Sequence, residues 1–185
     1  MMPETTARSL LRAETRDQHD QVDRIFSQVR LDDRREYGAF LSAQAAAHIP
    51  VEGALAAGGV ATIVPDWDAR QRGDLIRADL AALGLATPEP AGTIAFDGEA
   101  AVLGGLYVLE GSRLGGTMLQ RSVPADFPTR FLGGVDSAAW RSLLQMLDVR
   151  LDSAVKRSVA VAAARNVFAL FETSGQRFVR IGHFG

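Results

Sequence analysis

Five glycines fall within thirteen residues of an otherwise apolar, helix-forming stretch: Gly104, Gly105, Gly111, Gly115 and Gly116. A glycine inside a helix costs about 1 kcal/mol relative to alanine, so five of them cost several kcal/mol, which is comparable with the stability of a small domain. A helix that keeps them needs its backbone close to another group, or needs to bend. This requirement constrains the fold more than any other feature of the chain.

Two interpretations of the stretch remain open. Gly111 and Gly115 are four residues apart and share one helical face, so together they form a flat strip against which a planar ligand could lie. Alternatively, the glycines mark close helix–helix packing of the small-xxx-small kind. A phosphate-binding loop is excluded, because the stretch contains neither a G-K-[ST] ending nor a G-x-G-x-x-G pattern.

The remainder of the chain has helical periodicity, with no convincing strand alternation. Helices are expected from a start signal at Pro3, Thr5 and Thr6 through Val29, from Asp32 or Asp33 to His48, from Asp66 to Leu83 with Gly84 as its stop, from Glu99 to Arg121, and over 137–150 and 153–180. Pro50 kinks or ends the second helix, or marks a restart that runs to about Ala57. The segments 85–98 and 122–136 contain prolines and glycines and are expected to be irregular. The sequence therefore predicts an all-α fold, with a single compact domain over 1–185 built from six or seven helices.

The composition excludes several kinds of function. The 185 residues include 20 basic and 22 acidic side chains, so the chain lacks the basic excess of a general nucleic-acid binder. It has no cysteine, which excludes a disulfide scaffold, a thiol nucleophile, an iron–sulfur cluster and a cysteine zinc site. The first residues lack the apolar core of a signal peptide, and no apolar run approaches the roughly 18 residues of a membrane span. A cytoplasmic protein without nucleic-acid or membrane partners is expected.

His19 is the histidine with the most informative surroundings. It shares a helical face with Leu11 and Phe26, so it is predicted to point toward the core. Arg12 and Arg16 lie within about 60° of the same direction. An imidazole beside two guanidinium groups and an apolar stripe suits a flat ligand with a central metal and carboxylates at its edge. The alternative is a half-buried core histidine beside a solvated arginine face.

Two segments resemble one family. LRAETRDQHDQVD, from Leu11 to Asp23, resembles the N-terminal helix of the heme oxygenases, and GLYVLEGSRLGG, from Gly105 to Gly116, resembles their distal helix. The similarity is greatest to the bacterial branch that supplies biliverdin to phytochromes. The two motifs occur in the expected order in a helical chain of suitable length.

The resemblance implies a role for each matching residue. His19 would be the proximal iron ligand, and Arg12 and Arg16 match basic residues of which at least one meets a heme propionate. Gly111 and Gly115 would pack on the heme and allow the helix to bend, and Gly116 would be a further heme contact. The C-terminal contacts have no matching motif, so Phe168, which is included among the heme-binding residues, and Trp140, Arg141 and Phe171 are guesses. Asp23 either orients the imidazole or remains a surface residue.

The proton path is less defined. Ser112 occupies the position where mammalian members have an aspartate, and a serine there is at home in the bacterial motif. Ser112, Arg113 and ordered water are the candidates for proton delivery. Together with Gly111 and Gly115, Ser112 completes the predicted catalytic set.

The implied reaction cleaves heme b, which is both cofactor and substrate, to biliverdin, carbon monoxide and ferrous iron using O2. The electrons would come from an external reductase or ferredoxin, because the chain has no flavin or iron–sulfur motif. A bacterial phytochrome is the expected bilin acceptor.

Other classes of function share some of these features. A heme carrier or sensor without turnover would show the same histidine and glycines, and a helical interaction protein would bind no heme. Thiaminase-like enzymes need a cysteine, and di-iron oxygenases need carboxylate–histidine sets, for which His48 and Glu52 form the only suggestive pair. His48 is otherwise a core or surface histidine, and His183 is expected in a mobile tail.

Overall fold

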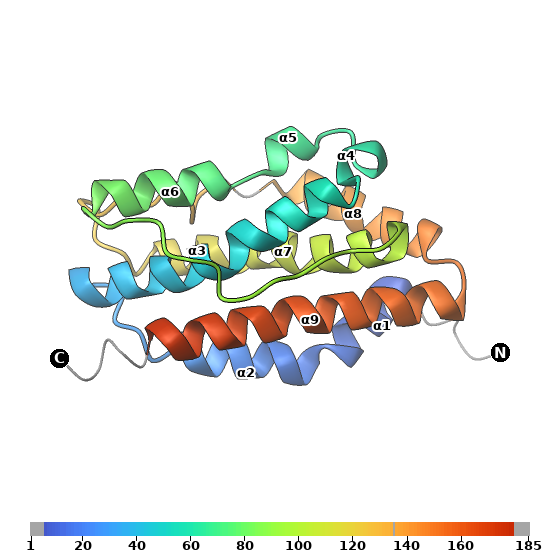
Figure 1. The fold of residues 1–185 in the computed structure, drawn as a ribbon, viewed down its shortest axis with the longest axis horizontal. Coiled ribbons are helices and arrows are strands. Elements are labelled where there is room, and N and C mark those ends of the chain that lie inside the picture. Colours follow the sequence, from blue (N-terminus) through green and yellow to red (C-terminus); the bar gives the residue numbers. More distant parts are fainter. Residues whose placement is uncertain (1–5, 135, 180–185) are drawn as a thin grey trace.

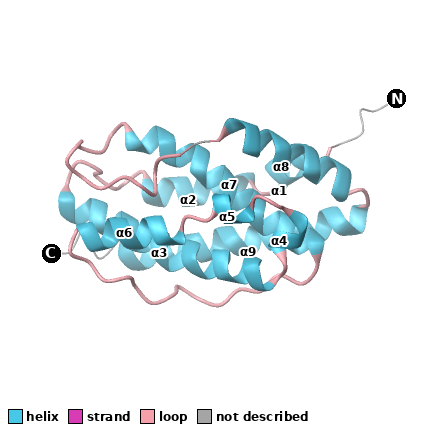
Figure 2. Ribbon diagram, turned by 90° about the horizontal axis from the view of Figure 1, so that it is seen from above, coloured by secondary structure: helices cyan, strands magenta, loops and turns pink. Residues whose placement is uncertain are grey.

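A computed structural model describes residues 6–134 and 136–179, and every regular element in these ranges is a helix (Figures 1 and 2). The all-α prediction is therefore confirmed. The helices, in chain order, are α1 (Ala7–Glu14), α2 (Arg16–Phe26), α3 (Arg34–Ala57), α4 (Val60–Ile63), α5 (Trp67–Arg70), α6 (Gly73–Ala82), α7 (Glu99–Gln120), α8 (Ser137–Arg150) and α9 (Ala154–Phe178). Pro3, Thr5 and His183 lie outside the described residues.

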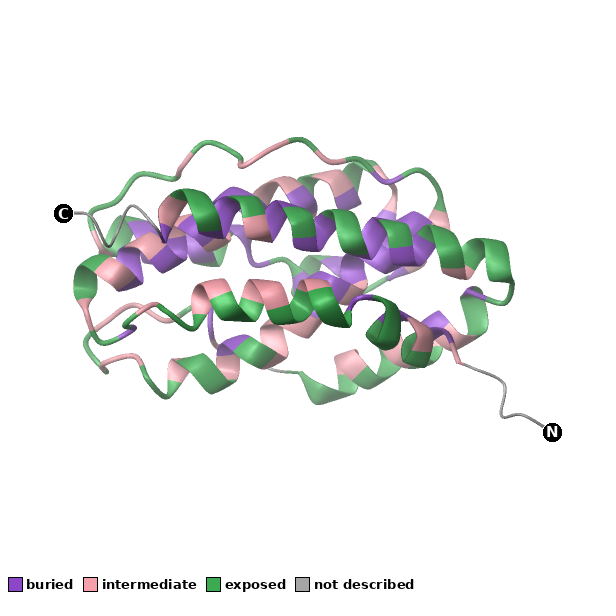
Figure 3. Ribbon diagram, turned by 90° about the horizontal axis from the view of Figure 1, so that it is seen from below, coloured by how far each residue is buried: buried purple, intermediate pink, exposed green. Residues whose placement is uncertain are grey.

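The helices form layers around a shared core. In Figure 1, α9 lies beside α1 and α2, while α3 and α7 run through the middle and α4, α5 and α6 lie on the opposite side. Figure 3 shows buried positions on the inward faces of the long helices and exposed positions on their outer faces. The main apolar cluster joins side chains of α3, α7, α8 and α9, including Leu55, Leu106, Leu147 and Val167. No helix in the described ranges is both long enough and apolar enough to cross a membrane.

The first predicted helix is broken in two, and this corrects the prediction. Thr6 caps α1 as expected, since its side chain accepts a hydrogen bond from the backbone N–H of Ser9. The break comes at Thr15, whose hydroxyl donates to the carbonyl of Leu11 at 2.7 Å. Back-bonding of this kind favours a bend, and the chain resumes in a new direction as α2.

The helix predicted over 66–83 is also interrupted. The Glu52 carboxylate accepts hydrogen bonds from the backbone N–H groups of Arg72, at 2.7 Å, and Gly73, at 3.1 Å. These amides begin α6 with a side-chain partner from α3, and the preceding turn remains separate as α5. With the short α4 in the expected loop, the two breaks bring the described helices to nine, where six or seven were predicted.

Pro50 neither ends nor restarts α3, which continues through it to Ala57. Proline lacks an N–H group, so the carbonyl of Ala46 has no partner within the helix. The backbone N–H of Ala91, in the irregular segment after α6, donates to that carbonyl at 2.8 Å. A segment distant in sequence thus repairs the helix where the proline would otherwise weaken it.

The contact between α7 and α9 depends on Gly104. A Cβ atom at this position would collide with the carbonyl oxygen of Ala160, a backbone atom of α9. By contrast, a Cβ at Gly53, in the interior of α3, would meet nothing within 4 Å.

We therefore expect opposite effects from two Gly→Ala substitutions. Gly104→Ala should lower the free energy of unfolding by about 3 kcal/mol, because the added methyl group forces the two helices apart. Gly53→Ala should raise it by about 0.5 to 1 kcal/mol through helix propensity alone. Urea denaturation of both variants measures the difference. Equal effects would show that the close approach at Gly104 has no energetic weight.

Candidate functional site

A cavity of about 810 Å³ opens between α1 and α2 on one side and α7 on the other. Its volume lies within the range of about 300–1,000 Å³ that is typical of small-molecule sites. All the residues predicted from sequence as site residues line it: Arg12, Arg16, His19, Gly111, Ser112, Gly115, Gly116 and Phe168. The fold therefore brings together two motifs that are about ninety residues apart in sequence.

His19 lies on α2, at the wall opposite the glycines of α7. Its side chain is 58% exposed, so the expectation of a histidine directed into the core is wrong. The physical reason is the break at Thr15, after which α2 buries no residue and presents His19 to the cavity. The ring contacts Phe168 edge-on, with centroids 6.0 Å apart.

The imidazole of His19 is held through one ring nitrogen. Its Nδ1 lies 3.3 Å from Oδ2 of Asp23, with Oδ1 of Asp20 at 3.7 Å. A carboxylate at Nδ1 fixes the orientation of a metal-binding imidazole and leaves Nε2 as the ligating atom. Of the two interpretations of Asp23, the geometry favours the orienting one, although its side chain also remains exposed.

The glycines of α7 divide into two groups. A Cβ at Gly105 would lie 2.5 Å from the Phe96 ring, and Gly104 contacts the backbone of α9, so these two serve packing. A Cβ at Gly115 would meet nothing within 4 Å, and one at Gly111 only the Trp140 ring at 3.8 Å. No protein contact requires a glycine at 111 or 115, and both line the cavity. The packing interpretation thus holds for the first pair and the ligand-strip interpretation fits the second.

The remaining side chains around the cavity give it an apolar body and a cationic rim. Arg12 and Arg16 are exposed at the cavity and form no ion pair with any described residue. Trp140 lines the wall and stacks on Tyr107, with centroids 5.8 Å apart. Phe171 also lines the cavity, and Arg141 does not. Free guanidinium groups beside an aromatic surface fit a flat ligand that carries acidic groups.

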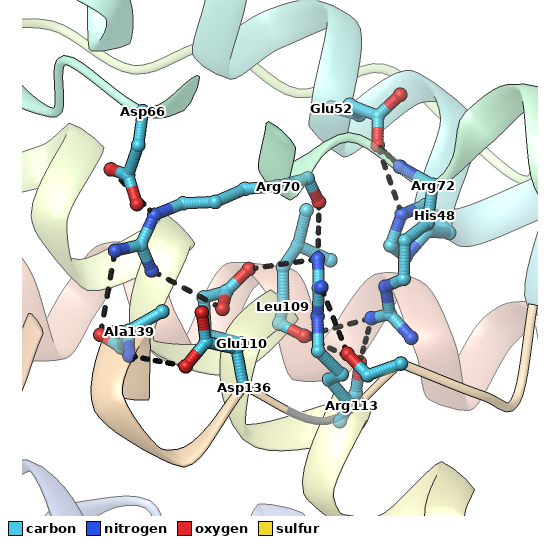
Figure 4. A network of polar contacts seen from close by, with 12 residues as sticks. His48, Glu52, Asp66, Arg70, Arg72, Leu109, Glu110, Arg113, Asp136 and Ala139 are labelled. Carbon is cyan, nitrogen blue, oxygen red and sulfur yellow. Dashed lines mark hydrogen bonds and ion pairs between the residues drawn. The ribbon is translucent and has the colours of Figure 1, made fainter. Parts of the chain in front are cut away.

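Behind α7 lies a buried polar network that the sequence analysis missed (Figure 4). Arg70 connects Asp66, at 3.0 Å, to Glu110 of α7, at 3.3 Å. Arg72 donates from Nη2 to the hydroxyl of Ser112, at 2.8 Å, and to the carbonyl of Leu109, at 3.0 Å. No sequence signal marks these two arginines. Tyr107, in contrast, is four residues before Gly111 on the same helical face and could have been found from that spacing.

Arg113 belongs to this network and does not line the cavity. Its guanidinium donates to the carbonyl of Arg70 and, at 3.3 Å, to that of Gly134. Of the two residues considered for proton delivery, Ser112 is therefore the one that lines the cavity.

His48 and Glu52 also belong to this network. Nε2 of His48 lies 3.2 Å from the Glu52 carboxylate, which in turn binds the first amides of α6. Within the described residues, no group of three or more His, Asp or Glu side chains could hold a metal ion. Burial lowers the pKa of His48 to about 4, against the opposing effect of the Glu52 hydrogen bond, so the ring stays neutral at physiological pH.

Taken together, the fold and the cavity define a helical protein in which a histidine-bearing helix and a glycine-rich helix line one cavity of a size and lining that suit a planar ligand. Over 118 residues the chain is 38% identical to a heme oxygenase of Xanthomonas campestris pv. campestris (strain 8004), a match that covers 58% of this chain and 68% of the relative. These observations place the chain in the heme oxygenase family, whose members are oxidoreductases that degrade heme.

The fold agrees with this assignment. The structure of the NO- and CO-bound heme oxygenase from Neisseria meningitidis superimposes with a TM-score of 0.83 and 22% sequence identity, covering 95% of this chain and 92% of that one. No family model matches the chain.

The buried His48 predicts a pH dependence of stability. The unfolded chain protonates this histidine near its ordinary pKa of 6.5, whereas the folded protein resists protonation down to about pH 4. The unfolded state therefore binds the extra proton between these values, and stability falls as the pH drops from 6.5 to 4. The expected loss from this group is about 3 kcal/mol.

Urea denaturation of the ligand-free protein between pH 7 and pH 4.5 measures this loss. His48→Gln should lose most of the slope, while His19→Ala, at an exposed site, should keep it. Glu52 contributes in a lower window, because its own pKa is held below 4.5. An unchanged slope in His48→Gln would contradict the assignment to this histidine.

Proposed function

We propose that the protein is a heme oxygenase that cleaves heme b to biliverdin, carbon monoxide and ferrous iron, and that residues 1–185 form a single domain for this purpose. The observation that carries the proposal is the opposition of His19 and the strip of Gly111 and Gly115 across one cavity. The arginines at the rim and the family assignment give further support.

On the proximal side, His19 would bind the iron through Nε2. Asp23 at Nδ1 keeps the ring in one orientation and raises the basicity of the ligating nitrogen. Phe168, edge-on to the imidazole, restricts its rotation and adds apolar surface to the cavity. When bound, heme supplies both the redox-active iron and the ring that is oxidised.

At the rim, Arg12 and Arg16 would bind the two propionates. Both guanidinium groups lack an ion-pair partner among the described residues, so neither must give up an internal partner to bind a carboxylate. Charge-assisted hydrogen bonds of this kind fix the rotation of a flat ligand in its plane. That rotation decides which part of the ring lies over each residue of α7.

On the distal side, Gly111 and Gly115 would allow the backbone of α7 to approach the ligand without side-chain contact, and Gly116 lines the cavity beside Leu132. Of the residues with hydroxyl groups that line the cavity, which also include Ser9, Thr15 and Tyr107, Ser112 is the one that lies between these glycines in sequence. Ser112, with ordered water, would hold and deliver the protons that the reaction consumes.

The electron source and the product acceptor lie outside this chain in the proposal. The sequence has no cysteine for an iron–sulfur cluster and no flavin motif, so a reductase or ferredoxin would supply the electrons. The resemblance of the two helical motifs to the phytochrome-associated branch supports a bacterial phytochrome as the acceptor of the bilin.

A hemin titration followed by reduction in air tests the proposal. The wild type should bind one hemin, and its Soret band should give way to a broad red bilin band when ascorbate is added. His19→Ala should lose the imidazole-ligated spectrum, whereas Asp17→Ala, on the same helix but outside the cavity, should behave as wild type. A Soret band that persists under ascorbate and air would indicate a heme carrier or sensor. Binding that does not depend on His19 would contradict the proximal assignment.

The role of the arginines has its own test. Replacing both Arg12 and Arg16 with alanine should weaken hemin binding by about tenfold or more, because charge-assisted hydrogen bonds to the propionates are lost. The dimethyl ester of hemin has no carboxylates and serves as the matched ligand. Wild type should prefer hemin to the ester, and the double variant should bind both equally. Undiminished preference in the variant would place the propionates elsewhere.

A further inference from the structure

Arg72, part of the buried network in Figure 4, does not line the cavity, but its side chain bonds to Ser112, which does. It lies between α5 and α6 and is 3% exposed. From Nη2 it reaches the hydroxyl of Ser112 and the carbonyl of Leu109, at 2.8 and 3.0 Å. Both acceptors belong to a single turn of α7.

The position of Arg72 is fixed from its other side. Its backbone N–H donates to Glu52, which also meets His48, so the residue is tied to α3. Its guanidinium lies over the Phe131 ring, 4.7 Å from the centroid, and Nη1 donates to the carbonyl of the same residue at 3.4 Å. A planar fork with three bonding directions suits this role in a way that a lysine ammonium does not.

The turn that Arg72 contacts lies where the side-chain packing of α7 changes. Leu109 and Glu110 are buried, whereas Gly111 and Gly115 line the cavity and offer no side chain to hold this part of α7. Interior glycines also weaken a helix. The side-chain bonds of Arg72, together with the ion pairs of Glu110, therefore hold the turn at a fixed height over the cavity.

Arg72 also affects what the Ser112 hydroxyl can do. That hydroxyl donates to the Leu109 carbonyl at 2.6 Å, and the same carbonyl already accepts a hydrogen bond from Arg72. The hydroxyl can therefore turn its proton toward the cavity without leaving a buried carbonyl unsatisfied. A cation that donates to the hydroxyl oxygen also makes the O–H group a stronger donor.

We propose that Arg72 is a positioning residue for the distal wall: its guanidinium fixes the Leu109–Ser112 turn of α7 and presents the Ser112 hydroxyl as a donor to the cavity. The inference rests on the proposed function, in which α7 faces the bound heme. The first test of the inference is nevertheless made on the ligand-free protein, so that the inference and the proposed function can fail separately.

Hydrogen exchange of the ligand-free protein tests the mechanical part. Arg72→Lys keeps the charge but loses the fork, and backbone amides over 112–116 should exchange about tenfold faster, with amides of α9 unchanged. Ser112→Ala should give a smaller increase. Ser174→Ala is the matched control, because this buried serine donates to the Ala43 carbonyl far from α7. Unchanged exchange over 112–116 in a folded Arg72→Lys variant would overturn the proposal.

A vibrational spectrum tests the donor part. The C–O stretching frequency of the ferrous carbon monoxide complex falls when a hydrogen-bond donor faces the ligand. Ser112→Ala and Arg72→Lys should both shift it upward, and the double variant should shift it no further than Ser112→Ala alone, because the arginine acts through the serine. Ser174→Ala should leave it unchanged. Additive shifts, or none in Arg72→Lys, would overturn the assignment, whereas failure to bind hemin at all in wild type would overturn the proposed function instead.

Discussion

The close backbone contact between α7 and α9 at Gly104 is the constraint on which the rest of the structure depends. It lets α7 run through the centre of the fold with its first half packed against the core. The second half of the same helix then emerges along the cavity, where a Cβ at Gly115 would meet nothing within 4 Å and one at Gly111 only the Trp140 ring. A single helix thus has a rigid, buried end that positions a second end adapted for ligand contact.

The polar network behind α7 extends this constraint to the cavity wall. Arg70 and Glu110 are both nearly buried and bond to one another, so the burial of each charge is offset by its partner. Removing one member would leave the other with fewer partners in a low-dielectric interior, Asp66 for Arg70 or Arg113 for Glu110, which is less favourable than the intact network. Such a network tolerates few alternative geometries. We infer that it specifies the position of α7 more than it raises the overall stability.

The sequence predicted the architecture and the two walls of the site, because both depend on local pattern. Helical periodicity located the long helices, and the four-residue separation of Gly111 and Gly115 identified the strip that faces the cavity. The prediction that His19 points toward the core was wrong because the helix breaks at Thr15, whose hydroxyl donates to the Leu11 carbonyl. Threonine does not always break a helix in this way, so the sequence alone did not indicate the break.

What the sequence could not reveal are contacts between residues distant in the chain. Arg72 looks like any arginine in a polar helix, and only the capping of α6 by Glu52 turns its side chain inward. The sequence likewise gives no sign that the Ala91 amide binds the Ala46 carbonyl left free by Pro50, since any non-proline residue offers the same N–H group. Such interactions require the tertiary structure, whereas patterns with a helical period do not.

The two walls of the cavity differ in how they are held. On one side, α7 is packed against α9 and bonded from behind by buried arginines. On the other, α2 buries no residue, and its histidine pairs with an exposed aspartate. Local opening requires least free energy where few apolar contacts are buried, so α2 is the wall that yields more easily. Such an asymmetry suits a site that must admit a large flat ligand and still hold one face of it in a fixed geometry, because the adjustable wall and the fixed wall are separate helices.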